Sequence, residues 1–249
     1  MKTIGLIGGM SWESTAEYYQ IINETVQERL GRLQSARIVM YSVDFEDVEQ
    51  LQHEGKWDEA ATLMIDAAKR VEGAGADFVL ICTNTMHKMA NEVAASINIP
   101  LLHIADATAE RIVSSGSKKI ALLGTKFTME QDFYKDRLAK RNKLDVLIPD
   151  ETSRQVIHDI IYKELCLGKT RNSSREQLKA ILQNFIDDGA QGIILGCTEL
   201  PLLMKQYDRT VPLFDTAKIH AHAAVEYALK YDGQVQYRQD ISLHFPISS

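Results

Sequence analysis

The chain has few cysteines, and no two of them have the spacing of a metal-binding motif. Only three of its 249 residues are cysteine, Cys82, Cys166 and Cys197. An odd number without any C-x-x-C pair disfavours both a disulfide framework and a zinc site. The cysteine content therefore predicts a reducing, cytoplasmic setting. Each thiol is then expected to be either a buried small hydrophobic group or a chemical reagent.

Long apolar runs and blocks of positive charge are also missing. No apolar stretch approaches the roughly 20 residues of a membrane-spanning helix, and the N-terminus lacks the cleavage pattern of a secretory signal. The net charge is −6, with 45% hydrophobic and 25% charged residues. These values are ordinary for a globular protein and exclude a disordered or fibrous chain. They predict no nucleic-acid partner and no membrane partner.

Two common enzyme motifs are absent as well. The glycines of Gly5-Leu-Ile-Gly-Gly9 do not form G-x-G-x-x-G, the fingerprint of dinucleotide binding. No serine lies in a G-x-S-x-G turn, which disfavours a hydrolase triad. The sequence therefore predicts neither a cofactor nor a metal.

Short apolar runs alternate with longer stretches of helical period. Strands are expected at 4–8, 37–43 and 78–82, and helices at 14–30, 57–74 and 84–96. Alternation of strand and helix predicts an α/β fold with mostly parallel sheets flanked by helices.

The pattern then repeats in the second half of the chain. Lys119–Gly124 is similar to Lys2–Gly8, and Gly189–Cys197 is similar to Gly75–Thr83, an offset of 114 residues (189 − 75). We therefore predict two pseudo-symmetric α/β domains, one of residues 1–99 plus 212–249 and one of residues 100–211. The hinges are expected near residues 100 and 212, and a helix at 217–230 is expected to return to the first domain.

Polar residues follow three of the predicted strands, at 8–11, 83–87 and 197–199. Ligands of parallel sheets bind at the carboxyl ends of the strands, where such turns meet. The repeat aligns Thr83 with Cys197, so the two side chains are expected to face each other across a cleft. By contrast, Cys166 in a predicted helix at 160–167 is expected in the core, and His220 at a surface or interface.

The position of these turns, between a strand and a helix N-terminus, favours binding of a carboxylate. The same field predicts a lowered pKa for the thiol of Cys197. A thiolate opposite a hydroxyl suits removal of a proton from one face of a carbon and delivery to the other. Taken singly, a buried cysteine is more typical of packing and a threonine of helix capping. Their alignment by the repeat favours a functional site.

Three segments together, Met1–Met10, Thr83–His87 and Leu195–Leu200, resemble motifs of the aspartate/glutamate racemase superfamily. These are amino-acid racemases that use no pyridoxal phosphate. The resemblance extends to about Lys230. It implies an active site between two pseudo-symmetric domains, in a homodimer, with one catalytic cysteine from each domain on either side of the substrate Cα.

The resemblance also implies roles for individual residues. Cys197 occupies the place of the second catalytic cysteine, with Glu199 as its partner. The positions that hold the substrate or line its pocket are Met10, Gln52, Asn84, Thr85, Thr125 and Thr198.

One departure from the family pattern is Thr83, which stands where the first catalytic cysteine is expected. Cys82 comes one residue early, and neighbouring side chains of a strand point to opposite faces. A threonine hydroxyl can donate a proton but is a poor base. We therefore expect Cys197 to deprotonate the L-isomer and Thr83 to reprotonate the other face. Because the equilibrium constant of racemisation is one, kcat/KM must still be equal in the two directions.

A second departure concerns the side-chain carboxylate of an acidic substrate. No arginine lies between Tyr41 and Lys69, and Cys166 replaces a lysine of the family, with Lys163 one turn earlier as a possible substitute. Without a guanidinium for bidentate binding, a broader range of amino acids is expected. Two alternatives stay open: a non-catalytic amino-acid or carboxylate binder, and a sister decarboxylase or maleate isomerase.

Overall fold

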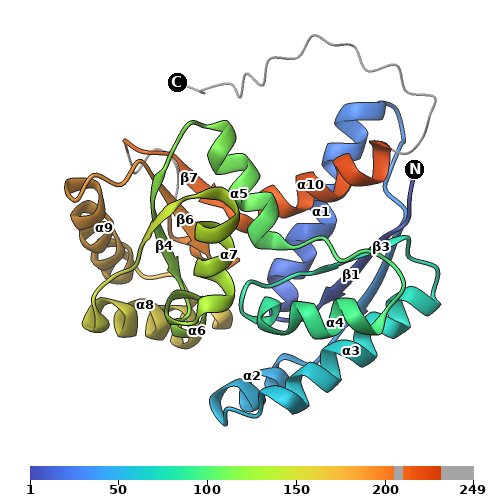
Figure 1. Cartoon of the computed structure of the whole chain (residues 1–249), viewed down its shortest axis with the longest axis horizontal. Coiled ribbons are helices and arrows are strands. Elements are labelled where there is room, and N and C mark those ends of the chain that lie inside the picture. The colour runs from blue at the N-terminus through green and yellow to red at the C-terminus, as the bar shows by residue number, and fades with distance from the viewer. Residues whose placement is uncertain (205–209, 231–249) are drawn as a thin grey trace.

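The computed structural model describes residues 1–204 and 210–230, which form two parallel sheets with helices on their faces (Figure 1). The first sheet has the strand order β2-β1-β3 and the second the order β5-β4-β6-β7. In each, the first strand of a half-chain lies between the second and the third, so the topology repeats as the sequence does. This confirms the predicted α/β class with two similar units. The tail from Tyr231 lies outside the described residues.

The first half of the chain forms the first sheet and most of its covering helices. Its elements are β1 (Ile4–Gly8), α1 (Trp12–Leu30), β2 (Ile38–Ser42), α2 (Phe45–His53), α3 (Trp57–Gly73), β3 (Phe78–Ile81), the 3₁₀ turn η1 (Thr85–Met89) and α4 (Ala90–Ser96). Strands β1 and β3 are buried along their whole length. Burial on both faces explains why these strands are continuous apolar runs and do not alternate.

The second half builds the second sheet in the same way. Its elements are α5 (Ile104–Ser114), β4 (Lys119–Gly124), α6 (Lys126–Glu130), α7 (Asp132–Asn142), β5 (Asp145–Leu147), α8 (Glu151–Lys163), η2 (Leu165–Leu167), α9 (Asn172–Asp187), β6 (Gly192–Gly196), η3 (Leu200–Leu202), β7 (Leu213–Asp215) and α10 (Thr216–Lys230). No helix of residues 1–204 and 210–230 has the length and hydropathy that a membrane span requires.

Three helical segments differ from the prediction. Helix α1 begins at Trp12 because the Ser11 hydroxyl caps it, accepting a hydrogen bond from the Ser14 amide. The predicted helix at 84–96 is divided into η1 and α4. Helix α2 was not predicted: it has only nine residues, and only Val48 and Gln52 of its side chains are buried.

The chain passes between the two sheets twice. Leu101 still pairs with Val79 beside the first sheet, whereas α5, which follows it, packs in the core of the second. Likewise β7 pairs with β6, whereas α10 packs against α1 and the first core. Figure 1 shows α5 and α10 between the two sheets, where α5 belongs to the core of the second sheet and α10 to that of the first. The domain limits at residues 99 and 212 stay a prediction.

Three buried histidines lie beside these crossings: His87, His103 and His220. His220 was expected at a surface or interface, and this is wrong. Its Nε2–H donates to the carbonyl of Leu102, which can only accept, so its Nδ1 accepts from the hydroxyl of Tyr18. Burial lowers the pKa of His220 to about 4 and holds that of His87 well below its usual value.

We expect the free energy of unfolding to fall as the pH is lowered from 6.5 towards 4. The unfolded chain binds a proton at each histidine near pH 6.5, whereas native His220 does so only near pH 4. Since the unfolded state holds more protons in this window, stability is lost there, by about 3 kcal/mol for His220 over the whole window. Urea unfolding at pH 7.5, 6 and 5 measures the slope.

The matched control is His220→Gln, whose amide can donate to Leu102 without titrating. Its stability should depend less steeply on pH than that of the parent chain. An unfolding free energy that is the same at pH 7.5 and 5 would contradict this account.

Candidate functional site

A small pocket lies where the carboxyl ends of strands from both sheets meet. The cavity inside it has a volume of about 20 Å³. The residues that line it are Met10, Phe45, Gln52, Thr83, Asn84, Thr85, Thr125, Ile161, Tyr162, Cys166, Gly196, Cys197 and Glu199. Eight of the nine residues selected from the sequence are among them. The ninth, Thr198, is buried beside the pocket and contacts Glu199.

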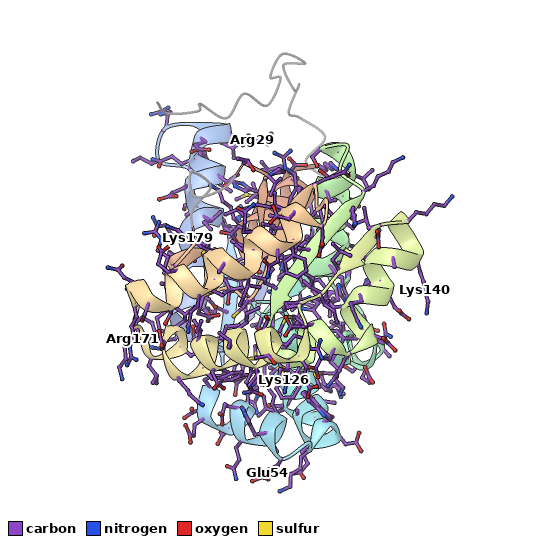
Figure 2. All side chains as sticks on the ribbon, turned by 90° about the vertical axis from the view of Figure 1, so that its left-hand side faces the viewer. Arg29, Glu54, Lys126, Lys140, Arg171 and Lys179 are labelled. Carbon is purple, nitrogen blue, oxygen red and sulfur yellow. The ribbon has the colours of Figure 1, made fainter. Side chains whose placement is uncertain are left out.

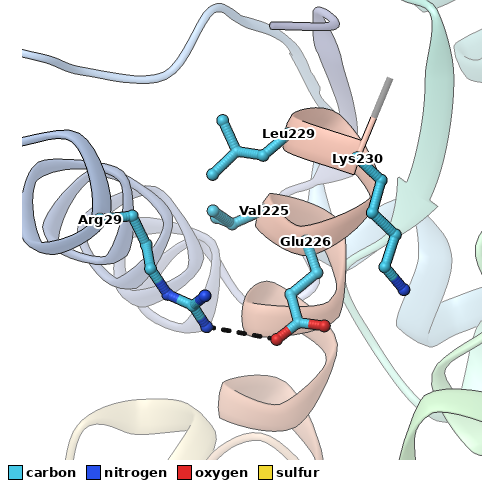
Figure 3. A pocket seen from close by; sticks show the side chains of 5 residues that line it. All are labelled: Arg29, Val225, Glu226, Leu229 and Lys230. Carbon is cyan, nitrogen blue, oxygen red and sulfur yellow. Dashed lines mark hydrogen bonds and ion pairs between the residues drawn. The ribbon is translucent and has the colours of Figure 1, made fainter. Parts of the chain in front are cut away.

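A second hollow, with a volume of about 260 Å³, lies on the outer surface between α1 and α10 (Figure 3). Arg29 and Glu226 form an ion pair of 3.3 Å across it. Neither a thiol nor a strand end lines this hollow, so the strand-end pocket is the candidate site.

The turn after β1 brings the backbone of the first sheet close to the pocket. Gly9 has a φ of +95°, a conformation that side chains other than glycine rarely adopt. A Cβ at this position would lie 2.1 Å from the carbonyl oxygen of Val43. Glycine therefore lets the chain turn sharply against β2 and present Met10 and Ser11 to the second sheet.

Glu199 is the centre of a hydrogen-bond network that joins the two halves of the chain. Its Oε1 accepts from the hydroxyl of Ser11 at 2.8 Å. Its Oε2 accepts from the Sγ–H of Cys197 and from the hydroxyl of Thr198, both at 2.9 Å. These three donors satisfy the hydrogen-bonding capacity of the buried carboxyl group. Glu199 is also the one charged side chain among those that line the pocket.

Cys197 is buried, and its environment differs from the expected one. Burial and the carboxylate of Glu199 raise the pKa of the Cys197 thiol well above its usual value, so the predicted lowering is wrong. In a pocket this closed, desolvation and a neighbouring negative charge outweigh the field at the end of the strand. Cys197 is therefore a thiol at neutral pH, and it already donates its proton towards Glu199.

Asn84 carries an unused acceptor within the described part of the chain. The hydroxyl of Thr216 donates to the carbonyl of Leu195, so it must accept from the Asn84 amide nitrogen, at 3.0 Å. This fixes the orientation of the amide. Its Oδ1 is then buried without a hydrogen-bond partner. A buried orphan acceptor in a pocket favours a ligand that brings an N–H or O–H group.

Three threonine hydroxyls form a cluster between the two sheets. The Oγ1 atoms of Thr85 and Thr125 are 3.0 Å apart, and that of Thr128 lies 3.4 Å and 3.2 Å from them. Thr125 also caps α6, since its hydroxyl accepts from the Thr128 amide. Each hydroxyl can donate and accept, so this cluster can turn its hydrogens towards a carboxylate.

Neighbouring residues 82 and 83 lie on opposite sides of the strand end. Cys82 is fully buried in the first core, with Tyr18 and Ala217, and burial raises the pKa of its thiol. Thr83 lines the pocket. The thiol of Cys82 therefore does not line the pocket, and the group that shares the pocket with Cys197 from this strand end is the Thr83 hydroxyl.

Cys166 was expected in the core. It packs against the second core, as expected, but it is only half-buried and it also lines the pocket. Helix α8 ends at Lys163, and residues 165–167 form the 3₁₀ turn η2, so the α-helical spacing used to place Cys166 does not hold there. Lys163 does not substitute for the missing cation: it is paired with Asp159 at 2.9 Å and its side chain is 72% exposed.

Other pocket residues could not be found from the sequence. Phe45 lies at the start of the unpredicted helix α2, and Ile161 and Tyr162 lie at the end of α8. The Tyr162 hydroxyl donates to Oε1 of Gln52 at 2.8 Å, and so links α8 to α2 across the pocket. Apolar and aromatic residues near a helix end carry no signal that separates a pocket wall from ordinary packing.

Comparison with known proteins adds independent evidence. A model of the family described as Asp/Glu/Hydantoin racemase matches residues 7–224. The chain belongs to this family. It is therefore an enzyme of the isomerase class, an amino-acid racemase, as the motifs predicted.

Several members of the family are similar over most of their length. A crystal structure of a candidate Asp/Glu racemase from Yersinia pestis is 51% identical, with a TM-score of 0.86, over 92% of this chain and all of that one. An aspartate racemase homologue from Pyrococcus horikoshii OT3 is 37% identical, with a TM-score of 0.79, over 92% and 99% of the two chains. The broad-specificity amino-acid racemase RacX of Bacillus subtilis is 25% identical over 92% and 99%.

Proposed function

We propose that this racemase moves the Cα proton of an amino acid without a cofactor, with Cys197 on one face of the substrate and Thr83 on the other. The observation that carries this proposal is that one thiol and one hydroxyl, from equivalent strand ends of the two halves, line a single small pocket. Glu199 completes the set, because it contacts the thiol directly.

The first step needs a thiolate, and Glu199 is the group that can generate it. The proton of the Cys197 Sγ–H passes to Oε2 of Glu199 along their existing hydrogen bond. The thiolate then takes the proton from Cα, and the electron pair of the C–H bond stays on the substrate as a carbanion. An ammonium group bound close by lowers the cost of both charges.

Thr83 completes the inversion from the opposite face. Its hydroxyl donates a proton to the carbanion, which forms the Cα–H bond of the other enantiomer. The resulting alkoxide is reprotonated by water when the product leaves, and Glu199 returns its proton to solvent. A closed pocket that excludes water during the reaction lets fixed dipoles stabilise the carbanion.

The remaining polar residues suit the backbone groups of an amino acid. The orphan Oδ1 of Asn84 can accept from the substrate ammonium, and the hydroxyls of Thr85 and Thr125 can donate to its carboxylate. Thr198 differs from its implied role. Its hydroxyl already donates to Glu199, so we assign it to holding that carboxylate in place and not to binding substrate.

The rest of the pocket favours substrates with uncharged side chains. Met10, Phe45 and Ile161 are apolar, Tyr162 is neutral, and no lysine or arginine is among the lining residues of the described chain. The charged side chains labelled in Figure 2, such as Lys140 and Arg171, project from the outer surface. An acidic side chain would meet Glu199 without a compensating cation, so aspartate and glutamate should be poor substrates.

The deciding experiment is incubation in D₂O with a panel of L- and D-amino acids, followed by chiral chromatography with mass detection. We expect deuterium at Cα in the opposite enantiomer, and larger amounts with neutral substrates than with aspartate or glutamate. Preference for the two acidic substrates would overturn the proposed substrate class. Amino-acid binding by calorimetry without any deuterium would replace the racemase by a binding protein.

Tyr162→Phe should raise KM about fivefold and change kcat less. Removing the hydroxyl breaks its hydrogen bond to Gln52 across the pocket, and such a bond contributes about 1 kcal/mol. Burial raises the pKa of Tyr162, so the phenol is the donor throughout the neutral range. Steady-state kinetics measures the change, with Tyr41→Phe at the exposed Tyr41 of β2 as control. Equal KM values in both variants would show that this link does not hold the pocket closed.

We also propose that the enzyme acts as a homodimer in the cytoplasm. Trp12 and Tyr19 are 68% and 53% exposed on α1. Their spacing of seven residues places them on one face of the helix, and exposed aromatic residues are typical of protein interfaces. Light scattering on the purified chain tests the dimer, and Tyr19→Glu should weaken it.

A further inference from the structure

The three buried histidines form a row beside the pocket that the proposed reaction does not use. The ring centres of His87 and His103 are 4.4 Å apart, and those of His87 and His220 are 5.7 Å apart. None of them lines the pocket. Burial of three imidazoles is costly unless their nitrogens are satisfied, so the contacts of this row show what it holds together.

The hydrogen bonds of His87 define its tautomer. Its Nδ1 lies 2.7 Å from the carbonyl oxygen of Thr83, which can only accept. Its Nε2 lies 3.2 Å from the amide nitrogen of Ile104, which can only donate. The ring is therefore neutral with the proton on Nδ1. Both nitrogens are used, and both partners are backbone groups.

These two partners belong to different parts of the fold. Thr83 follows β3 at the pocket, on the first sheet. Ile104 is the first residue of α5, directly after the chain has crossed, and it is buried in the second core. The His87 ring thus links the backbone of Thr83, beside the first sheet, to the first residue of α5, which packs on the second sheet.

We propose that His87 is a positioning residue for Thr83. By holding the Thr83 carbonyl, it sets where the Thr83 hydroxyl lies relative to Cys197, and it makes that position follow the packing of α5. This inference rests on the proposed function. The position set by His87 affects only the delivery of a proton by Thr83, which depends steeply on the placement of the donor. Proton removal by Cys197 is unaffected, because Cys197 is held separately by Glu199.

Two conservative variants separate the two hydrogen bonds. In His87→Asn the side-chain amide lies near the position of Nδ1 and can still donate to Thr83. In His87→Gln the amide reaches towards the position of Nε2 and can still accept from Ile104, but the bond to Thr83 is lost. His103→Gln alters the neighbouring ring and the cap of α5, where His103 Nδ1 accepts from the Ala105 amide, but it removes neither bond of His87, and it controls for a general loosening of the row.

The readout is the fate of an L-amino acid in D₂O, with the melting temperature of each variant measured in parallel. Deuterium in the retained L-isomer measures proton exchange by Cys197, and deuterium in the D-isomer measures proton delivery by Thr83. We expect His87→Gln to lower the ratio of D- to L-product about tenfold, with exchange into the L-isomer within about twofold of the parent. His87→Asn and His103→Gln should keep the parental ratio.

Each other outcome overturns the inference. If His87→Gln lowers both products in parallel, or leaves the ratio unchanged, His87 supports the fold and does not position Thr83. If His87→Gln does not fold, His87→Asn still decides, because a tenfold fall of its ratio contradicts the role of the Thr83 bond. If the parent chain shows no α-proton exchange at all, the proposed function itself is wrong. If the parent chain racemises and His87→Gln has the same product ratio, only the role of His87 is wrong.

Discussion

Replacing Cys197 with alanine should abolish α-proton exchange from the L-isomer and racemisation in both directions. We expect a loss of at least about 10³-fold, since a positioned acid–base group contributes about 10²–10⁴-fold and no other lining residue contacts Glu199 through a thiol. Deuterium incorporation at Cα, measured over hours, checks this loss. Cys197→Ser should fall almost as far, because a hydroxyl can bind Glu199 but is a much weaker acid than a thiol.

The matched control is Cys82→Ala. It removes a thiol from the residue next to Thr83, yet this thiol lies in the first core and not in the pocket. Some stability should be lost, but α-proton exchange should remain close to that of the parent chain. Exchange at the parental rate in Cys197→Ala would remove this residue from the mechanism.

Thr83→Cys should raise kcat by about ten- to a hundredfold, most clearly with D-substrate. A thiol on this face can act as both acid and base, whereas a hydroxyl only donates well. A positioned acid–base group contributes about 10²–10⁴-fold. The expected gain is smaller than the upper end of this range, because the new thiol has no neighbouring carboxylate of the kind that Glu199 provides for Cys197. Progress curves from each pure enantiomer, followed by circular dichroism, give kcat and KM in both directions.

Thr83→Val is the comparison that isolates the hydroxyl. It keeps the shape of threonine and removes the donor, so deuterium should enter the retained L-isomer while the D-isomer no longer forms. No gain in Thr83→Cys together with normal inversion in Thr83→Val would show that residue 83 does not lie opposite the substrate.

The sequence was sufficient to predict the architecture because its signals are local and repeated. The apolar runs at 4–8 and 119–124 are both central, buried strands, and a buried parallel strand needs no partner to be recognised. The strand-end turns followed from the same logic, since parallel strands bring their carboxyl ends together. For this reason the sequence alone could place Thr83, Asn84 and Cys197 near one another, and all three line the pocket.

Features that depend on tertiary contacts could not be predicted in this way. The raised pKa of Cys197 results from burial and from Glu199, and both require the closed pocket. The place of Cys166 depends on where α8 changes into a 3₁₀ turn. The burial of His220 depends on Tyr18 and Leu102, about 200 and 118 residues away in the chain, and no local pattern reports such partners.

The exchange of α5 and α10 between the sheets has a consequence for how this protein folds. Ala217, Ala221 and Val225 of α10 cover the first core, while Ile104 and Ile112 of α5 cover the second. Residues 1–115 made alone would lack α10 over the first core and carry α5 without the second core, and residues 116–230 would lack α5 and carry α10 without the first core. The two repeats, although each resembles a complete α/β unit, therefore depend on each other for a closed core. On the ribosome, the first repeat must wait for the last helix of the second before its core is closed.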